Sequence, residues 1–192
     1  MSTYLRRAGS GLLPDGSQLV WSVADGRRGR RWRAVASSDG VISHALLLEV
    51  DSAGRPSRLE LTTPAGMLTL HPEEGGGGLH GNVVTASGMR HLALPWSDDH
   101  GLEVVGRPIG SAVTAHRLAA AVAVGEGRTV PVVVIAPDLE VAETARQYVR
   151  VGAGEWRIES ASGDAVVTVL RIDEHGVPVP QRDAREWPLE LE

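Results

Sequence analysis

Residues 130–177 read VPVVVIAPDLEVAETARQYVRVGAGEWRIESASGDAVVTVLRIDEHGV, and this stretch decides the fold class. Val149 and Val151 alternate with Tyr148 and Arg150, and the apolar Trp156 and Ile158 alternate with the charged Arg157 and Glu159. A short reversal at 152–154 lies between these two runs, so they predict a β-hairpin. Further compact reversals at 162–164 and 173–176 enclose a run, 166–172, with every second residue apolar or β-branched. The stretch therefore predicts antiparallel strands joined by tight turns.

The composition indicates one β-rich domain over residues 1–192. A chain of 192 residues with 42% hydrophobic content is long enough to bury one substantial core. It has no Phe, two Tyr and five Trp, so Val, Leu and Ala must supply most of the buried volume. Valine favours strands because its branched side chain is stiff.

Two missing residue types exclude several kinds of chemistry. The chain has no Cys, which excludes disulfides, thiolate metal sites and cysteine nucleophiles. All 19 basic residues are Arg, so the lysine of a phosphate-binding loop or a Schiff-base enzyme is absent. A net charge of −5 argues against nonspecific nucleic-acid binding.

We expect a cytoplasmic protein without a membrane span. The N-terminal residues 1–16 contain no apolar run of signal-peptide length, and no later segment approaches the roughly 18 apolar residues of a membrane-spanning helix.

The rest of the chain reads as a meander of short strands. So many antiparallel strands in one domain must curl. The predicted fold is mainly β, an antiparallel twisted roll or open barrel of about a dozen strands with one short helix; two packed layers are the alternative. The predicted strands before the helix are 17–24, 31–36, 41–50, 57–62, 67–71, 79–84, 89–94 and 102–105.

One helix is expected at 112–123, with Ser111 as its N-cap and Gly125 beyond its end. Residues 138–148 fit both strand alternation and helical spacing, and we favour a strand.

Neither a metal site nor a catalytic motif is evident. Four histidines, at 71, 80, 91 and 100, recur at spacings of nine to eleven, but no His-x-His pair occurs of the kind that places two ligands on one face of a strand. The Gly-x-Ser-x-Gly elbow is absent, and no Gly-x-Gly-x-x-Gly follows a strand and opens a helix. We therefore assign no catalytic residue, no metal and no cofactor.

The most basic segment is RRGRRWR at residues 27–33. It can clamp phosphate or stack on a base, or it can be a solvated hairpin tip. Strand alternation puts Arg31 and Arg33 opposite Trp32, which leaves Trp32 free to enter the core. We favour the hairpin tip, which is also compatible with an anionic headgroup at the rim.

Four aromatic residues, Trp21, Trp96, Tyr148 and Trp156, have the setting of buried side chains. They either line a ligand cavity, with Arg117 or Arg150 as a polar group, or simply form the core.

The order of motifs over residues 54–191 resembles a known bacterial family. The motifs are Gly54-Arg55-Pro56-Ser57-Arg58-Leu59, His116-Arg117-Leu118, Val130-Pro131-Val132-Val133, Gln147-Tyr148-Val149-Arg150, Trp156, Glu159-Ser160, Asp173-Glu174-x-Gly176-Val177 and an acidic tail. Together they resemble the bacterial glycolipid-binding domain family, formerly described as a domain of unknown function. The resemblance is strongest from Val130 to Val177. At 111–118 the chain departs from the family pattern, and there only Arg117 and Leu118 match.

The resemblance implies a twisted, roll-like sheet with a concave apolar face. We expect a non-enzymatic protein that holds an amphipathic small molecule, such as a glycolipid or an acyl chain, in that concavity. The expected ligand-binding residues are Arg117, Arg150, Trp156 and Glu159.

Two other functions stay open. One is an enzyme acting on a sugar-like or phosphorylated substrate, with His116 as base and Glu174 as its carboxylate partner. The other is a scaffold whose concave face receives a partner protein, which predicts a filled interior and an exposed apolar patch. The oligomeric state is not predicted.

Overall fold

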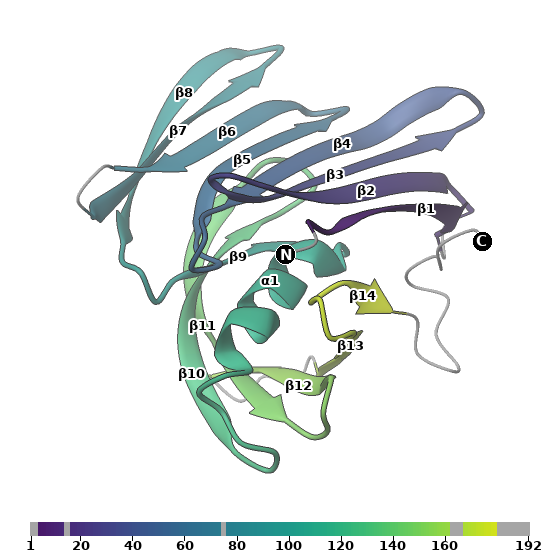
Figure 1. The fold of residues 1–192 in the computed structure, drawn as a ribbon. Helices are drawn as coiled ribbons and strands as arrows, with labels where there is room; N and C mark the ends of the chain where they lie inside the picture. Colours follow the sequence, from purple (N-terminus) through teal and green to yellow (C-terminus); the bar gives the residue numbers. More distant parts are fainter. Residues whose placement is uncertain (1–3, 14–15, 74–75, 162–166, 180–192) are drawn as a thin grey trace.

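A computed structural model describes residues 4–13, 16–73, 76–161 and 167–179, and Figure 1 shows how they are arranged. These residues form fourteen strands and one helix. The predicted reversal at 162–164 and the acidic tail lie outside the described residues. The prediction of a mainly β, curled antiparallel fold with one short helix is confirmed, apart from one parallel pair of strands.

The first sheet is an eight-stranded antiparallel meander in which each strand pairs with the next one in the chain. Short turns with Gly or Asp join most of its strands, as the sequence indicated. Its strands are β1 (Arg6–Leu12), β2 (Gln18–Gly26), β3 (Gly29–Ser38), β4 (Val41–Val50), β5 (Pro56–Thr63), β6 (Gly66–Pro72), β7 (Gly77–Thr85) and β8 (Gly88–Trp96). The strand β1 was not predicted, because its small and polar residues show little alternation.

Alternation along these strands buries one face of the sheet. In β3 the side chain of Trp32 is 1% exposed, whereas Arg31 and Arg33 on the other face are exposed. The expectation that Trp32 enters the core is therefore confirmed. In β4 the residues Leu46 and Leu48 are likewise buried on the inner face.

A second, six-stranded sheet follows. Its order is β14-β13-β12-β11-β10-β9. The strands are β9 (Gly101–Val104), β10 (Gly127–Ile135), β11 (Val141–Arg150), β12 (Glu155–Ser160), β13 (Thr168–Ile172) and β14 (Pro178–Val179). The predicted hairpin is β11–β12, and the ambiguous segment 138–148 contributes most of strand β11, as favoured.

One pair in this sheet is not antiparallel. Strand β9 runs parallel to β10, with Leu102 opposite Val133. This pair is an exception to the predicted antiparallel pairing, because the chain passes through the helix between β9 and β10 and returns in the same direction.

The helix α1 (Pro108–Leu118) begins four residues earlier and ends five residues earlier than predicted. Pro108 occupies the first turn, where its fixed φ suits a helix start. The N-cap is Arg107, without a side-chain cap, so the prediction of Ser111 as N-cap is wrong. Ser111 is instead a buried residue inside the helix.

The helix lies between the two sheets (Figure 1). Its residues Ile109 and Val113 belong to the core cluster that includes the inner face of the first sheet. Ala115 and Leu118 belong to a second cluster with the aromatic residues of the second sheet. Helix α1 therefore fills the concave face that was expected to hold a ligand.

No helix in the described part of the chain has the length and apolar character needed to cross a membrane.

A Gly110→Ala variant should test the close packing of α1. A Cβ at Gly110 would lie 2.1 Å from the carbonyl oxygen of Leu102 in β9, so the helix must move away from the strand. We expect a loss of about 1–3 kcal/mol in the free energy of unfolding, measured by urea denaturation. A Gly26→Ala variant is the control, because its Cβ would meet no atom closer than 3.8 Å. Equal stability of the two variants would contradict this account.

Candidate ligand-binding groove

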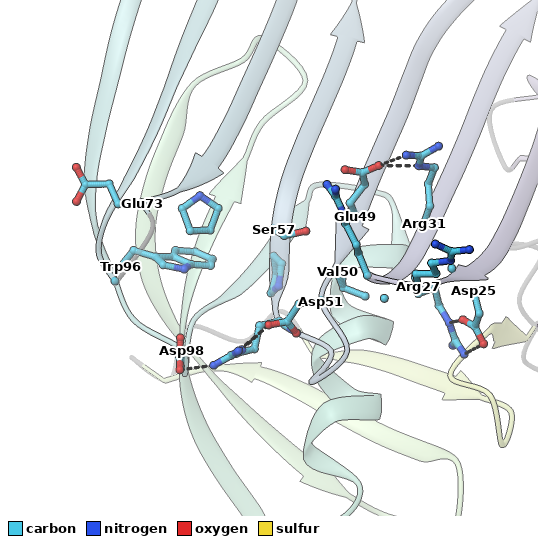
Figure 2. A pocket seen from close by; sticks show the side chains of 18 of the residues that line it. Asp25, Arg27, Arg31, Glu49, Val50, Asp51, Ser57, Glu73, Trp96 and Asp98 are labelled. Atoms are coloured by element: carbon cyan, nitrogen blue, oxygen red, sulfur yellow. Dashed lines mark hydrogen bonds and ion pairs between the residues drawn. The ribbon is translucent and has the colours of Figure 1, made fainter. Parts of the chain in front are cut away.

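A groove of about 1460 Å³ runs along one end of the eight-stranded sheet. It forms where the β2–β3, β4–β5 and β6–β7 connections meet the segment that follows β8. Figure 2 shows Glu73, Trp96 and Asp98 on one side of the groove and Asp25, Arg27 and Arg31 on the other. The groove therefore lies at the strand ends, outside the packed space between the sheets.

The β2–β3 hairpin presents two arginines to this groove. Arg27 and Arg28 form its two-residue turn between Gly26 and Gly29, which are paired. Gly29 has a φ of 131°, and a Cβ there would lie 2.0 Å from the carbonyl oxygen of Val50, so this position requires glycine. Both arginines are exposed, and they make no hydrogen bond or ion pair with any other residue that the structure describes.

The neighbouring arginines of the hairpin are paired. Arg31 Nε donates to Glu49 Oε1 at 2.6 Å, and Arg30 Nε donates to Asp25 Oδ1 at 2.6 Å. Partial burial by itself raises the pKa of Asp25, but the hydrogen bond and charge of Arg30 outweigh it, so this pKa lies below its usual value. The Asp25 carboxylate is therefore ionised at neutral pH, and these two pairs hold Arg30 and Arg31 in place.

On the β4–β5 side, Arg55 holds two carboxylates. Its Nε donates to Asp51 Oδ2 at 2.7 Å, and its Nη1 donates to Asp98. Burial by itself raises the pKa of Asp51, but hydrogen bonds from the Arg55 amide, the Arg55 guanidinium and the Ala53 amide outweigh this effect, so the pKa lies below its usual value. This pair joins the β4–β5 connection to the segment after β8 (Figure 2).

The groove also has an apolar part, supplied by Val50, Pro56, Pro72 and Trp96. Trp96 stacks on His100, with ring centroids 4.9 Å apart. Charged rims beside an apolar strip give the groove an amphipathic lining.

The predicted ligand-binding residue Arg117 borders a smaller pocket of about 150 Å³, which shares Arg55 and Asp98 with the groove. Its guanidinium donates to the backbone carbonyls of Asp98, Asp99 and His100 at 2.6–3.0 Å. In this arrangement Arg117 holds the segment after β8 on the helix.

The structure brings two other predicted residues, Arg150 and Trp156, together. They are cross-strand partners, and the Arg150 guanidinium lies 5.8 Å from the centre of the Trp156 ring. Arg150 Nη1 also donates to the carbonyls of Ala119 and Val122, just after α1. Trp156 is fully buried, and none of these residues lines the groove. Their role in binding stays a prediction.

The fourth predicted residue, Glu159, pairs with Arg157 Nε at 2.6 Å on a partly exposed part of β12. It does not line the groove either. Its role in binding likewise stays a prediction.

The four aromatic residues singled out in the sequence are all buried. Tyr148 and Trp156 meet edge to face at 6.5 Å in the core of the second sheet. Burial raises the pKa of Tyr148 to about 12, so it stays a neutral phenol at physiological pH. Of the four, only Trp96 lines the groove.

His116 and Glu174, the residues of the enzyme alternative, are not hydrogen-bonded to each other. Burial and the charge of Arg30 lower the pKa of His116, which leaves the imidazole neutral at pH 7. Glu174, however, is 86% exposed and lies 3.6 Å from His175, and no hydrogen bond joins it to His116 among the described residues. Nothing in this geometry favours the enzyme alternative.

Near His116 the two sheets are linked by a polar junction. Arg7 of β1 pairs with Asp173, and Arg30 of β3 donates to the carbonyl of His175. Asp173 Oδ1 also accepts hydrogen bonds from the amides of His175 and Val177, each at 2.9 Å. The turn before β14 is thereby fastened to the first sheet.

No group of three or more His, Asp or Glu residues placed to hold a metal occurs in the described ranges. His71 and His80 are cross-strand partners, and His80 Nε2 lies 2.7 Å from Glu73 Oε1.

The fold is similar to that of a solved structure, the crystal structure of a DUF1089 family protein from Pseudomonas aeruginosa. The TM-score is 0.57 and 20% of the residues are identical, over 95% of this chain and 91% of that chain. At this identity the likeness shows a shared fold alone. No family model matches the chain. No curated protein matches it either.

Sequence reasoning found part of the groove. The segment 27–33 and the motif 54–59 both contribute lining residues, and both were noted. Asp25, Glu49 and Glu73 were missed as a site, because they lie far apart in the chain and meet only when the strand ends are aligned in the sheet.

A Trp156→Ala variant should separate a core role from a ligand contact. Because Trp156 is fully buried, we expect a loss of about 3–5 kcal/mol in the free energy of unfolding by urea denaturation. A purely structural role of Trp156 would leave the ligand affinity of the folded protein unchanged. Weaker ligand binding at unchanged stability would show that Trp156 contacts the ligand.

An Asp173→Asn variant should weaken the junction between the sheets. Burial raises the pKa of Asp173, but hydrogen bonds from Arg7 and two amides outweigh this and lower the pKa below its usual value. The ionised group therefore stabilises the fold above about pH 4, and this stabilisation is lost as the pH falls further. We expect a loss of about 1 kcal/mol at pH 7, since the pair is partly screened by solvent.

The measurement is the free energy of unfolding from pH 7 to pH 3. The difference between wild type and the Asn variant should shrink on acidification. A constant difference would contradict the assignment.

Proposed function

We propose that this protein binds an amphipathic small molecule, such as a glycolipid, in the groove at the strand ends. The observation that carries this proposal is the lining, in which an apolar strip with Val50 and Trp96 lies between charged rims. A ligand with an acyl part and a polar headgroup matches both kinds of surface.

The side chains at one side of the groove suit a sugar. Pro72, beside the largely buried Trp96, offers apolar surface for the C–H face of a sugar ring, and Glu73 and Asp98 offer carboxylate oxygens that accept hydrogen bonds from hydroxyls. The resemblance of residues 54–191 to the glycolipid-binding domain family supports the same ligand class.

The site of this proposal differs from the concavity expected at first. The concave face of the first sheet is covered by α1 and by side chains of β9 and β10, including Leu102, Ile109 and Val133, each at most 2% exposed. A ligand at the strand ends needs no opening of this core.

The experiment blocks the groove with a bulky side chain. Ser57 lines the groove on an exposed position of β5 and is labelled in Figure 2. A Ser57→Trp variant should bind monogalactosyl diacylglycerol, presented in detergent micelles, at least about tenfold more weakly than wild type by titration calorimetry. The control is Thr62→Trp, an exposed position of the same strand outside the groove.

Equal affinities of wild type, Ser57→Trp and Thr62→Trp would place binding elsewhere. Absence of binding to the wild type, together with no lipid detected by native mass spectrometry of the purified protein, would overturn the proposal.

A further inference from the structure

The charges of the groove are separated along its length. At the β2–β3 end, four arginines stand beside two carboxylates, Asp25 and Glu49. At the other end, Arg55 stands among three carboxylates, Asp51, Glu73 and Asp98. The two ends therefore carry opposite excess charge, and Figure 2 shows Glu73 and Asp98 opposite Asp25, Arg27 and Arg31, with Asp51 between them.

The excess positive charge lies on the two arginines of the hairpin turn. Arg30 and Arg31 donate to carboxylates within the protein, whereas Arg27 and Arg28 make no such bond to another described residue. Their guanidinium donors are free to meet a ligand. The planar guanidinium group of arginine can donate two hydrogen bonds to the oxygens of a phosphate. A phosphate has enough oxygens to accept hydrogen bonds from two arginines.

The hairpin is also built to keep these two side chains at the groove. The turn has only two residues, and Gly29 lets the start of β3 pass close to the backbone of Val50 and Asp51 in the β4–β5 connection. The Arg30–Asp25 pair then joins β3 to β2 across the hairpin, and the Arg31–Glu49 pair joins β3 to β4.

We infer that the ligand of this groove carries a phosphate group, bound by Arg27 and Arg28, next to a hydroxyl-rich ring that lies toward Trp96, Glu73 and Asp98. This inference rests on the proposed function and specifies its headgroup. The carboxylates at the far end repel a second anion there but accept hydrogen bonds from hydroxyls. A phosphorylated polyol or sugar has this distribution of groups.

The experiment compares two lipids with identical acyl chains. Phosphatidylinositol carries a phosphate beside a polyol ring, and monogalactosyl diacylglycerol carries an uncharged sugar. Both are presented in the same neutral detergent micelles at low salt. We expect wild type to bind phosphatidylinositol at least about tenfold more tightly. The double variant Arg27→Gln/Arg28→Gln should lose this preference.

Arg33→Gln is the control for loss of a positive charge outside the groove. Arg33 is an exposed arginine of β3, on the outer face of the sheet, and it does not line the groove. The preference for phosphatidylinositol should survive in this variant. If Arg33→Gln reduces it as much as the double variant, the effect is one of overall charge, and the inference is wrong.

Further outcomes separate the inference from the proposed function. If both lipids bind wild type with equal affinity, the groove binds lipid without recognising the phosphate group. The inference then fails, and the proposed function stands. If neither lipid binds, the proposed function fails, and myo-inositol 1-phosphate then decides the rest. Its binding, lost in the double variant, would support a phosphate site for a free phosphorylated polyol. Absence of that binding would overturn the inference as well.

Discussion

The close packing of α1 on β9 is the constraint on which the arrangement of the two sheets depends. Gly110 of the helix and Gly101 of the strand leave no room for a Cβ, since Leu102 O and Thr114 Oγ1 occupy the space. At this short distance the helix contacts both sheets, with Val113 in one core cluster and Leu118 in the other. A filled concave face follows, and the groove proposed as the ligand site lies at the strand ends instead.

Arginine side chains have two different roles in this protein. In both roles the guanidinium group can donate several hydrogen bonds at once. Arg117 and Arg150 each satisfy backbone carbonyls around the helix. Arg146 of β11 reaches Glu103 of β9 with an Nε–Oε2 distance of 2.9 Å, and this pairing raises its pKa. At the groove, by contrast, Arg27 and Arg28 have no partner among the described residues. The two sets of arginines look alike in the sequence and differ only in what surrounds them.

The junction near β14 connects the groove to the second sheet. Arg30 lines the groove, pairs with Asp25 and donates to His175 in the turn before β14. The same strand thus supports both the proposed ligand site and the contact between sheets. In the same junction, Arg7 pairs with Asp173, whose carboxylate also accepts hydrogen bonds from the amides of His175 and Val177. These interactions lower the pKa of Asp173 and keep its carboxylate ionised.

The amino-acid sequence by itself determined the strand content, the hairpin β11–β12 and the burial of Trp32 and Trp156, because alternation and turn residues act over a few positions. It did not determine the limits of α1, where Pro108 starts the helix early and Arg150 binds the carbonyls after its end. The parallel β9–β10 pair and the groove also depended on tertiary structure. Both arise from residues far apart in the chain, and short-range patterns carry no information about which strand ends meet.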